Sequence, residues 1–419
     1  MSTAKVTTGM QRVTAEQSRV ARTVARVPLS ARRGHTPVRG LHCRVLTRLG
    51  DWQDLQPWWD ELLAGSADST PWQSWDYLSR WWQHLSAGKE LRLLVVERDG
   101  RPVLVMPLQI SRRFEMLGLP VRMIEPIGMI MDVNRPRLAL GALDPDTYRC
   151  AFEALWNIRR DWDLIRIDEK LSDDPEVALL RRFAAGHGLW YRDIFSHLCP
   201  YLDLRQSWEA YLDTRGRRMR KNLRASQRKL EATGPVQLRE YSTPAEISRA
   251  YDHVLELHRA SWKGRKGVEQ SQSARYQAFY REWLDSLAQR GATRILVLFC
   301  GSRPAAATIA VTDGDTYYSA QIVHDERFRS ASPGTLLEAM EIEGLMRSGR
   351  YRQYDFLGAF LNNKLRWTGT ARSTSLVFVF RPSLRALLIE CYYFRAKPAI
   401  KALLRRMARR PPPPAAPAR

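Results

Sequence analysis

The sequence predicts a mixed α/β fold that is built from two similar domains and ends in a C-terminal helix. At 419 residues the chain is long for one hydrophobic core, and its 44% hydrophobic and 26% charged content is typical of a soluble globular protein. Each half shows the same order of helical and alternating strand patterns. The halves also share a helix start, Asp-Pro-Asp-Thr at 144–147 and Ser-Pro-Gly-Thr at 332–335, in which a capping residue precedes a proline at the first helical position.

The first domain is expected to span residues 41–204. Alternating apolar residues on both sides of Asp99-Gly100 predict a hairpin, because this dipeptide favours the tight turn between paired strands. Seven of the fourteen tryptophans fall within residues 52–82; they could stack on a sugar ring, but their helical spacing favours a role in the core. The expected helices are 52–63, 75–85, 145–160 and 175–185, and the expected strands are 91–97, 103–110, 121–124, 163–167 and 190–197.

The second domain, expected at 205–382, repeats this plan after a basic helix at its start. Its hairpin turns at Gly301-Ser302. The segment 215–229 is mostly Arg and Lys, so it is either a solvated connecting helix or a basic wall that faces an anionic ligand. The expected helices are 207–232, 244–258, 274–289 and one from Ser332 to near Gly349, and the expected strands are 236–241, 294–300, 305–311, 316–321, 354–356 and 376–380.

Basic segments flank the two domains and account for much of the net charge of +22, which favours anionic partners. Residues 1–40 are expected to be a disordered basic arm, with an organellar transit peptide as the alternative, because they lack the apolar core of a secretory signal. Residues 383–409 are expected to form a basic C-terminal helix, which either packs on the protein or lies on an anionic membrane surface. The Pro-rich tail 410–419 is expected to be disordered.

The cysteines indicate a reducing compartment. Cys43, Cys150, Cys199, Cys300 and Cys391 are scattered without paired spacing, which argues against a disulfide framework and against a zinc site. No run approaches the roughly 18 apolar residues of a membrane-spanning helix. We therefore expect a cytoplasmic protein without a metal cofactor, with peripheral contact to the inner membrane as an alternative.

The Ser-Pro-Gly turn is the strongest candidate for an anion site. Ser332 would cap the helix, Pro333 loses no helical hydrogen bond at the first position, and Gly334 leaves room for a ligand to approach the backbone. Free amides and the helix dipole would attract a phosphate, such as the pyrophosphate of an acyl-CoA; the alternative is a well-capped helix start without a ligand. The expected cofactor-binding residues are Arg327, Arg329, Ser332, Gly334, Thr335 and Leu336.

Two carboxylates, Asp144 and Asp146, occupy the matching turn of the first domain. They would repel a phosphate and could cap the helix themselves. If the halves are true repeats, the first domain is a degenerate copy that has lost the anion site.

Six short motifs follow one another in an order that resembles one acyltransferase family. They are WEAYL at 208–212, RKNLR at 220–224, LHRASW at 257–262, SPGTLL at 332–337, DFLG at 355–358 and KLRW at 364–367. This order is similar to that of the CelD-like, BioF-like acyltransferases of the GNAT superfamily, which are often linked to cellulose or exopolysaccharide production. The resemblance is good over about 200–370 and weak over 41–200. Fem-type peptidyltransferases share the tandem arrangement.

The resemblance implies a tandem GNAT-like, Fem-like fold and direct transfer of an acyl group from acetyl-CoA or another acyl-CoA. The expected acceptor is an amine or hydroxyl of a small molecule or glycan precursor in polysaccharide or cell-envelope metabolism. Such a reaction needs a base and oxyanion donors, and backbone N–H groups at the end of the strand 316–323 are natural donors. Lys364 and Arg366 either bind an anionic acceptor or pair with Asp355. The candidate catalytic residues are Asp355, Lys364, His258 and His324, and the candidate substrate-binding residues are Arg366 and Trp262.

Two other interpretations stay open, and a segment that departs from the family pattern supports the second of them. Family members have an acidic residue and an aromatic residue between the glycine and the lysine, where this chain has Ala-Phe-Leu-Asn-Asn at 359–363. The first alternative is a Fem-like transferase that takes its acyl group from aminoacyl-tRNA, which the basic charge would suit. The second is a membrane- or polysaccharide-associated scaffold with a degenerate site. Apart from tRNA in the first alternative, no nucleic-acid partner is expected.

Overall fold

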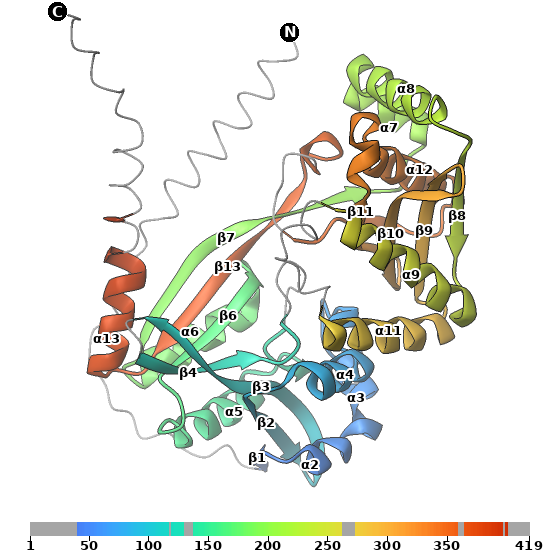
Figure 1. Ribbon diagram of the computed structural model, residues 1–419. Coiled ribbons are helices and arrows are strands. Elements are labelled where there is room, and N and C mark those ends of the chain that lie inside the picture. The colour runs from blue at the N-terminus through green and yellow to red at the C-terminus, as the bar shows by residue number, and fades with distance from the viewer. Residues whose placement is uncertain are drawn as a thin grey trace, which may run out of the picture.

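The computed structural model describes residues 40–116, 119–129, 137–261, 273–358, 364–396 and 399–400. It shows two α/β halves joined by strands that run from one half into the other (Figure 1). None of the helices in these ranges is long and apolar enough to cross a membrane.

The strands form one thirteen-stranded sheet with the order β1-β2-β3-β4-β6-β13-β7-β12-β11-β10-β9-β8, and β5 pairs with β3. Most neighbours are antiparallel, whereas β4–β6 and β11–β12 are parallel. The strands are β1 (Leu41–Leu46), β2 (Lys89–Arg98), β3 (Arg101–Met116), β4 (Leu119–Pro126), β5 (Leu140–Gly141), β6 (Leu164–Leu171), β7 (Trp190–Asp203), β8 (Val236–Tyr241), β9 (Thr293–Cys300), β10 (Arg303–Asp313), β11 (Thr316–His324), β12 (Gln353–Asp355) and β13 (Ala371–Phe380).

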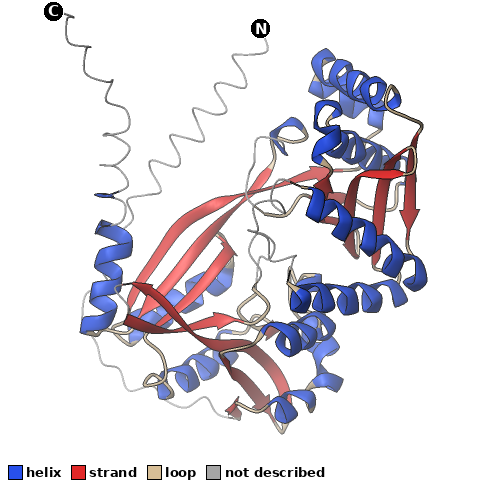
Figure 2. Ribbon diagram, in the orientation of Figure 1, coloured by secondary structure: helices blue, strands red, loops and turns tan. Residues whose placement is uncertain are grey.

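Helices cover both faces of the sheet in the second half (Figure 2). The alternating residues Ile295, Val297 and Phe299 of β9 pack towards α9 and α11, whereas Leu296 and Leu298 pack towards α8 and α12. The helices of the first half are α2 (Leu49–Gln53), α3 (Gln56–Ala64), α4 (Trp75–Leu85), α5 (Pro145–Asn157) and α6 (Pro175–Gly186). Those that follow are α7 (Trp208–Arg215), α8 (Arg217–Glu231), α9 (Pro244–Ala260), α11 (Ala274–Gln289), α12 (Pro333–Ser348) and α13 (Leu384–Cys391). Short 3₁₀ turns are η1 (Pro71–Gln73), η3 (Glu326–Ala331) and η4 (Lys364–Arg366), and a π turn, η5 (Tyr392–Ala396), follows α13.

The two halves exchange strands. β13 was expected in the second domain, but it lies between β6 and β7 of the first half. Conversely, the last residues of β7, Tyr201–Asp203, pair with β12 of the second half. Side chains on both faces of β13 are buried, Val377 and Val379 on one and Phe378 and Phe380 on the other. A strand that is apolar on both faces is stable only inside a sheet that is covered on both sides, and the position between β6 and β7 provides this.

The tryptophan-rich segment forms the core between the halves, as its helical spacing predicted. The α4 helix packs on α11, and Tyr77 makes an edge contact with Trp283, with ring centroids 4.9 Å apart. From η1, Trp72 contacts the ring of Tyr318 on β11 at 5.3 Å. Five of the seven tryptophans are buried, and the other two, Trp58 and Trp75, pack against this core. The interpretation as core is therefore confirmed.

Candidate functional site

The N-terminus of α12 follows η3 through a sharp change of direction at Ser332. This residue has φ 51° and ψ 52°, the left-handed conformation, and its side chain makes no capping hydrogen bond. Its carbonyl instead accepts hydrogen bonds from the amides of Thr335, at 3.0 Å, and Leu336, at 3.2 Å. The expected Ser332 side-chain cap is therefore wrong, and the amides of Thr335 and Leu336 are not free, because the carbonyl of the residue before a helix accepts the first helical hydrogen bonds. Within the described residues no acceptor is found for the Gly334 amide, which keeps it available to an anion.

Gly334 lies against the end of β11. A Cβ atom on this residue would lie 3.7 Å from Nδ1 of His324 and 3.8 Å from Cδ1 of Ile322. Two of the predicted site residues, Gly334 and His324, are thus neighbours. There is room for a small side chain at this position but a long one would occupy the space in front of the helix.

Positive charge surrounds this helix start. Arg366 donates to the hydroxyl of Thr335 at 2.7 Å, so its guanidinium lies beside the first turn. Arg329 is 80% exposed and lies 3.8 Å from Glu326, whereas Arg327 is held by Asp325. From α8, Lys229 reaches the carbonyl of residue 330 at 3.4 Å, which places the basic helix next to η3. These side chains make the region in front of α12 attractive to a phosphate.

The β11 and β12 strands separate soon after they meet. Their parallel pairing covers only Thr316–Tyr318 and Gln353–Asp355, and β11 continues for six residues. The register with β10 shifts between Ile309 and Ala310, so Ala320 of β11 is an extra residue in a β-bulge. The bulge and the separation of the strands both lie in the strand 316–323, for which the sequence predicted backbone N–H donors to an oxyanion.

A polar network from the α9–α11 face reaches the same stretch of β11. Nε2 of His258, near the end of α9, lies 3.2 Å from Oε1 of Gln321. The side-chain Nε2 of Gln321 in turn donates to the hydroxyl of Tyr276 on α11 at 3.4 Å. His258 is buried. An imidazole is therefore held next to the bulge, on the face of the sheet opposite to α12.

Asp355 ends β12 in full burial and takes a partner that the sequence analysis did not anticipate. One carboxylate oxygen accepts from the Leu357 amide at 3.0 Å, and the other pairs with Arg372 of β13 at 3.1 Å. Lys364 donates to the carbonyl of Phe356 at 2.9 Å, and Arg366 turns to α12. The exchanged strand β13 thus supplies an unforeseen partner for Asp355, and the pairing with Lys364 or Arg366 stays a prediction.

Two buried glutamates of α12 were missed by sequence reasoning. Glu338 accepts from Nε1 of Trp367 at 2.6 Å, and Glu341 accepts from the hydroxyls of Tyr317 and Tyr354, each at 2.7 Å. Burial raises the pKa of each carboxyl to about 7, although these hydrogen bonds favour the charged form. No sequence signal marked them, since glutamate is ordinary in a helix and only the packing on both sides of α12 makes these positions interior.

Trp262 and the variant segment 359–363 lie outside the described residues. The role expected for Trp262 therefore stays a prediction.

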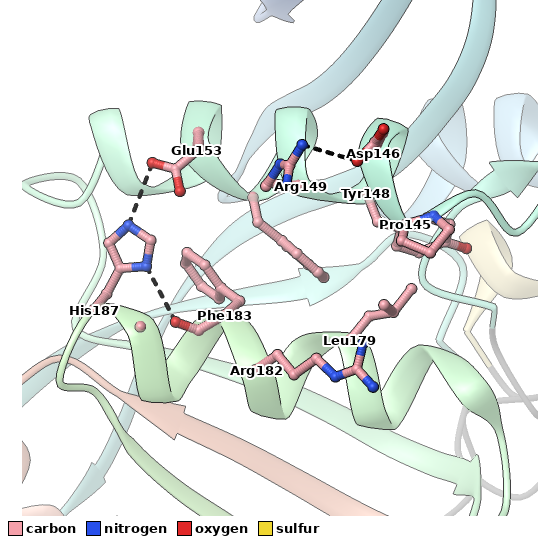
Figure 3. A pocket seen from close by; sticks show the side chains of 11 residues that line it. Pro145, Asp146, Tyr148, Arg149, Glu153, Leu179, Arg182, Phe183 and His187 are labelled. Atoms are coloured by element: carbon pink, nitrogen blue, oxygen red, sulfur yellow. Dashed lines mark hydrogen bonds and ion pairs between the residues drawn. The ribbon is translucent and has the colours of Figure 1, made fainter. Parts of the chain in front are cut away.

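The matching helix start of the first half is built differently. Asp144 caps α5 by accepting from the Asp146 amide at 3.1 Å, and Asp146 pairs with Arg149 at 2.8 Å. The pocket beside it, about 300 Å³ between α5 and α6, is lined mainly by apolar and aromatic groups such as Phe183, with His187 bonded to a carboxylate at its far end (Figure 3). Carboxylates thus occupy the position where an anion would bind.

A second pocket, of about 270 Å³, lies between the two halves beside β11. Thr316, Tyr318, Gln353 and Arg372 line it from the second half and the exchanged strand. From the first half comes Arg137, which is 5% exposed and whose Nε has no hydrogen-bond partner in the described part of the chain. This pocket lies along the stretch of β11 that pairs with β12, from Thr316 to Tyr318, and its polar lining suits a polar ligand.

These features together are those of a GNAT-like fold: a parallel pair of strands that separates, a bulge in the first of them, and a following helix whose start is open to a phosphate. Residues 217–364 match the acetyltransferase (GNAT) domain family, so the chain carries a GNAT-type acyltransferase domain. The sequence matches none of the curated proteins with which it was compared.

The fold of FemX extends over both halves of this chain. FemX superposes with a TM-score of 0.52 at 11% identity, over 81% of this chain and 98% of that one. The C-terminal domain of a putative lysylphosphatidylglycerol synthetase from Agrobacterium fabrum gives 0.49 at 9%, over 80% and 94%. A tandem GNAT protein of the clavulanic acid pathway gives 0.43 at 17%, over 82% and 99%. The predicted tandem GNAT-like, Fem-like fold is confirmed, and at these identities the likeness concerns the fold alone.

Proposed function

We propose that this protein transfers an acyl group from an acyl-CoA, with acetyl-CoA as the expected donor, to an amine or hydroxyl of a small molecule or glycan precursor in polysaccharide or cell-envelope metabolism. The observation that carries the proposal is the separation of β11 from β12 at the bulge, directly beside the open start of α12. The acyl-CoA pyrophosphate binds the Gly334 amide with Arg366 and Arg329 around it, and the thioester arm passes along the unpaired part of β11.

The reaction is a direct displacement. The acceptor nitrogen or oxygen attacks the thioester carbonyl carbon, the carbon–sulfur bond breaks, and CoA leaves as a thiolate that takes up a proton. The acceptor approaches from the face opposite to α12, where His258 can receive its proton and where the pocket beside Tyr318 holds its polar remainder. Backbone amides at the bulge stabilise the oxyanion.

Gly334→Glu is expected to abolish CoA binding, because its carboxylate would occupy the phosphate position at the helix start. Acetyl-CoA or CoA at a hundredfold excess over Kd should raise the melting temperature of the wild-type protein by about 3 °C, and that of the variant by less than about 1 °C. Gly344→Glu is the matched control, since it adds the same charge to an exposed position of the same helix with nothing within 4 Å of the new Cβ.

The same thermal series distinguishes the aminoacyl-tRNA alternative. Salt-sensitive stabilisation by tRNA at physiological ionic strength, with none by CoA, would replace the proposed donor. Equal stabilisation of Gly334→Glu and Gly344→Glu by CoA would show that the phosphate binds elsewhere, and no response to either ligand would favour a scaffold.

A further inference from the structure

The outer face of α13 carries leucine side chains that are exposed among the described residues. Leu384, Leu387 and Leu388 are 75%, 43% and 44% exposed, and their spacing places them on one face of the helix. The opposite face buries Ala386 and Ile389 against the sheet. Helices with apolar side chains on both faces are usually buried on both faces.

Two further exposed apolar side chains lie beside α13. Trp190 and Ile194 of β7 are each 36% exposed, and each pairs with a β13 residue whose side chain faces α13. Arg192, between them on the same face of β7, forms an ion pair with Glu390 of α13, which places the helix next to these residues. We call these five exposed side chains the α13 patch: Leu384, Leu387, Leu388, Trp190 and Ile194.

Positive charge borders the α13 patch. The side chains of Arg385 and Arg395 are 41% and 61% exposed; Arg385 lies 3.5 Å from Asp163, and Arg395 lies 3.9 Å from Glu390. The sequence from Cys391 to Arg419 contains eight basic residues and no acidic one. An apolar face bordered by arginines is the chemistry that binds the interface of an anionic bilayer.

We propose that the α13 patch docks this protein on an anionic membrane surface. The leucines enter the acyl-chain boundary, Trp190 lies at the headgroup level where its amphipathic ring is favoured, and the arginines contact lipid phosphates. The charge argues against a second copy of this chain as the occupant. In a symmetric dimer through the same patch, the basic borders of the two copies would face each other.

Vesicle co-sedimentation of the full chain tests the proposal. The wild-type protein should bind vesicles of phosphatidylcholine with one quarter phosphatidylglycerol at least tenfold more tightly than vesicles of phosphatidylcholine alone. Leu384→Glu with Leu388→Glu should weaken binding to the anionic vesicles at least tenfold. The matched control is Leu49→Glu with Leu143→Glu, which makes the same charge change at leucines that are 47% and 40% exposed on α2 and on the loop before α5, and it should bind as the wild type does.

Three results would overturn the proposal. The first is a patch variant that sediments with anionic vesicles as well as its control does, which would assign binding to the basic C-terminal sequence alone. The second is a wild-type protein that does not bind anionic vesicles. The third is a dimer in analytical ultracentrifugation that the patch variant dissolves, which would make a second copy the occupant. Equal melting temperatures of the two double variants exclude unfolding as the cause of a difference.

Discussion

A Glu176→Ala variant is expected to lose about 3–5 kcal/mol of the free energy of unfolding at pH 7, because it removes the counter-charge of the buried Arg137 and one of the two carboxylates that pair with the buried Lys170, the other being Asp174. Glu176, in the first turn of α6, is 1% exposed. It forms a close ion pair with Lys170 of β6 and lies 3.4 Å from Arg137, and these side chains are 2% and 4% exposed. Urea unfolding followed by circular dichroism measures the loss.

The same carboxylate also satisfies the backbone before β5. It accepts hydrogen bonds from the amides of Leu138, at 2.8 Å, and Ala139, at 3.1 Å, and from the hydroxyl of Tyr148. Burial opposes ionisation, but the charge of Lys170 and then that of Arg137 outweigh it and lower the pKa of Glu176. A carboxyl with a lowered pKa in the folded state contributes stability above its unfolded pKa and loses it as the pH falls. The wild-type and variant proteins should therefore converge in stability in acid.

Glu153→Ala is the control for this loss. Glu153 lies on α5, is 31% exposed in its side chain and lies 3.3 Å from His187, so removing it should change the free energy of unfolding by less than about 1 kcal/mol. A Glu176→Ala variant that is no less stable than Glu153→Ala would show that the buried charges find other partners. Glu176→Gln keeps an acceptor for the amides but removes the charge, and its stability should lie between those of the wild type and Glu176→Ala.

Sequence patterns were enough to predict the elements and the fold class, because both are set by local spacing. Alternation around Asp99-Gly100 and around Gly301-Ser302 placed both hairpins, and the proline at the first helical position placed the starts of α5 and α12. The exchange of β13 was not predictable in this way. It pairs residues up to about two hundred positions apart, such as Phe380 with Leu164, and local spacing contains no information on partners at that distance.

The sequence named residues of the candidate site, but it predicted only some of the contacts that these residues make. The structure brings Arg366 to the first turn of α12 and His324 beside Gly334, although the sequence had suggested Arg366 for the acceptor and His324 for catalysis. The partner of Asp355 was missed because it comes from the exchanged strand, and the bulge at Ala320 was missed because no residue type marks an extra strand residue. The assignment of the proton-accepting imidazole stays a prediction, and so does the assignment of the residues that bind the acyl-CoA.

Glu338→Gln is expected to stabilise the protein at pH 8 by up to about 3 kcal/mol, with little effect at pH 4.5 or below. The pKa of the Glu338 carboxyl is about 7 in the folded protein and near its ordinary value in the unfolded chain. Between these values the unfolded chain has released a proton that the folded protein keeps, so the unfolded state binds fewer protons and stability falls as the pH rises. Glutamine removes this dependence while its amide oxygen can still accept from Trp367. Urea unfolding at pH 4.5, 6 and 8 measures the difference.

A surface glutamate of the same helix provides the control for this pH-dependent stabilisation. Glu343 lies on the same helix but pairs with Arg347 at the surface, so Glu343→Gln should give no stabilisation that grows with pH. A pH-independent difference between Glu338→Gln and the wild type would mean that Glu338 is ionised at all these pH values and is held by Arg366 and Lys364 instead. The neighbouring Glu341 should then carry the remaining pH dependence, because its buried contacts with two tyrosine hydroxyls bring no positive charge to it.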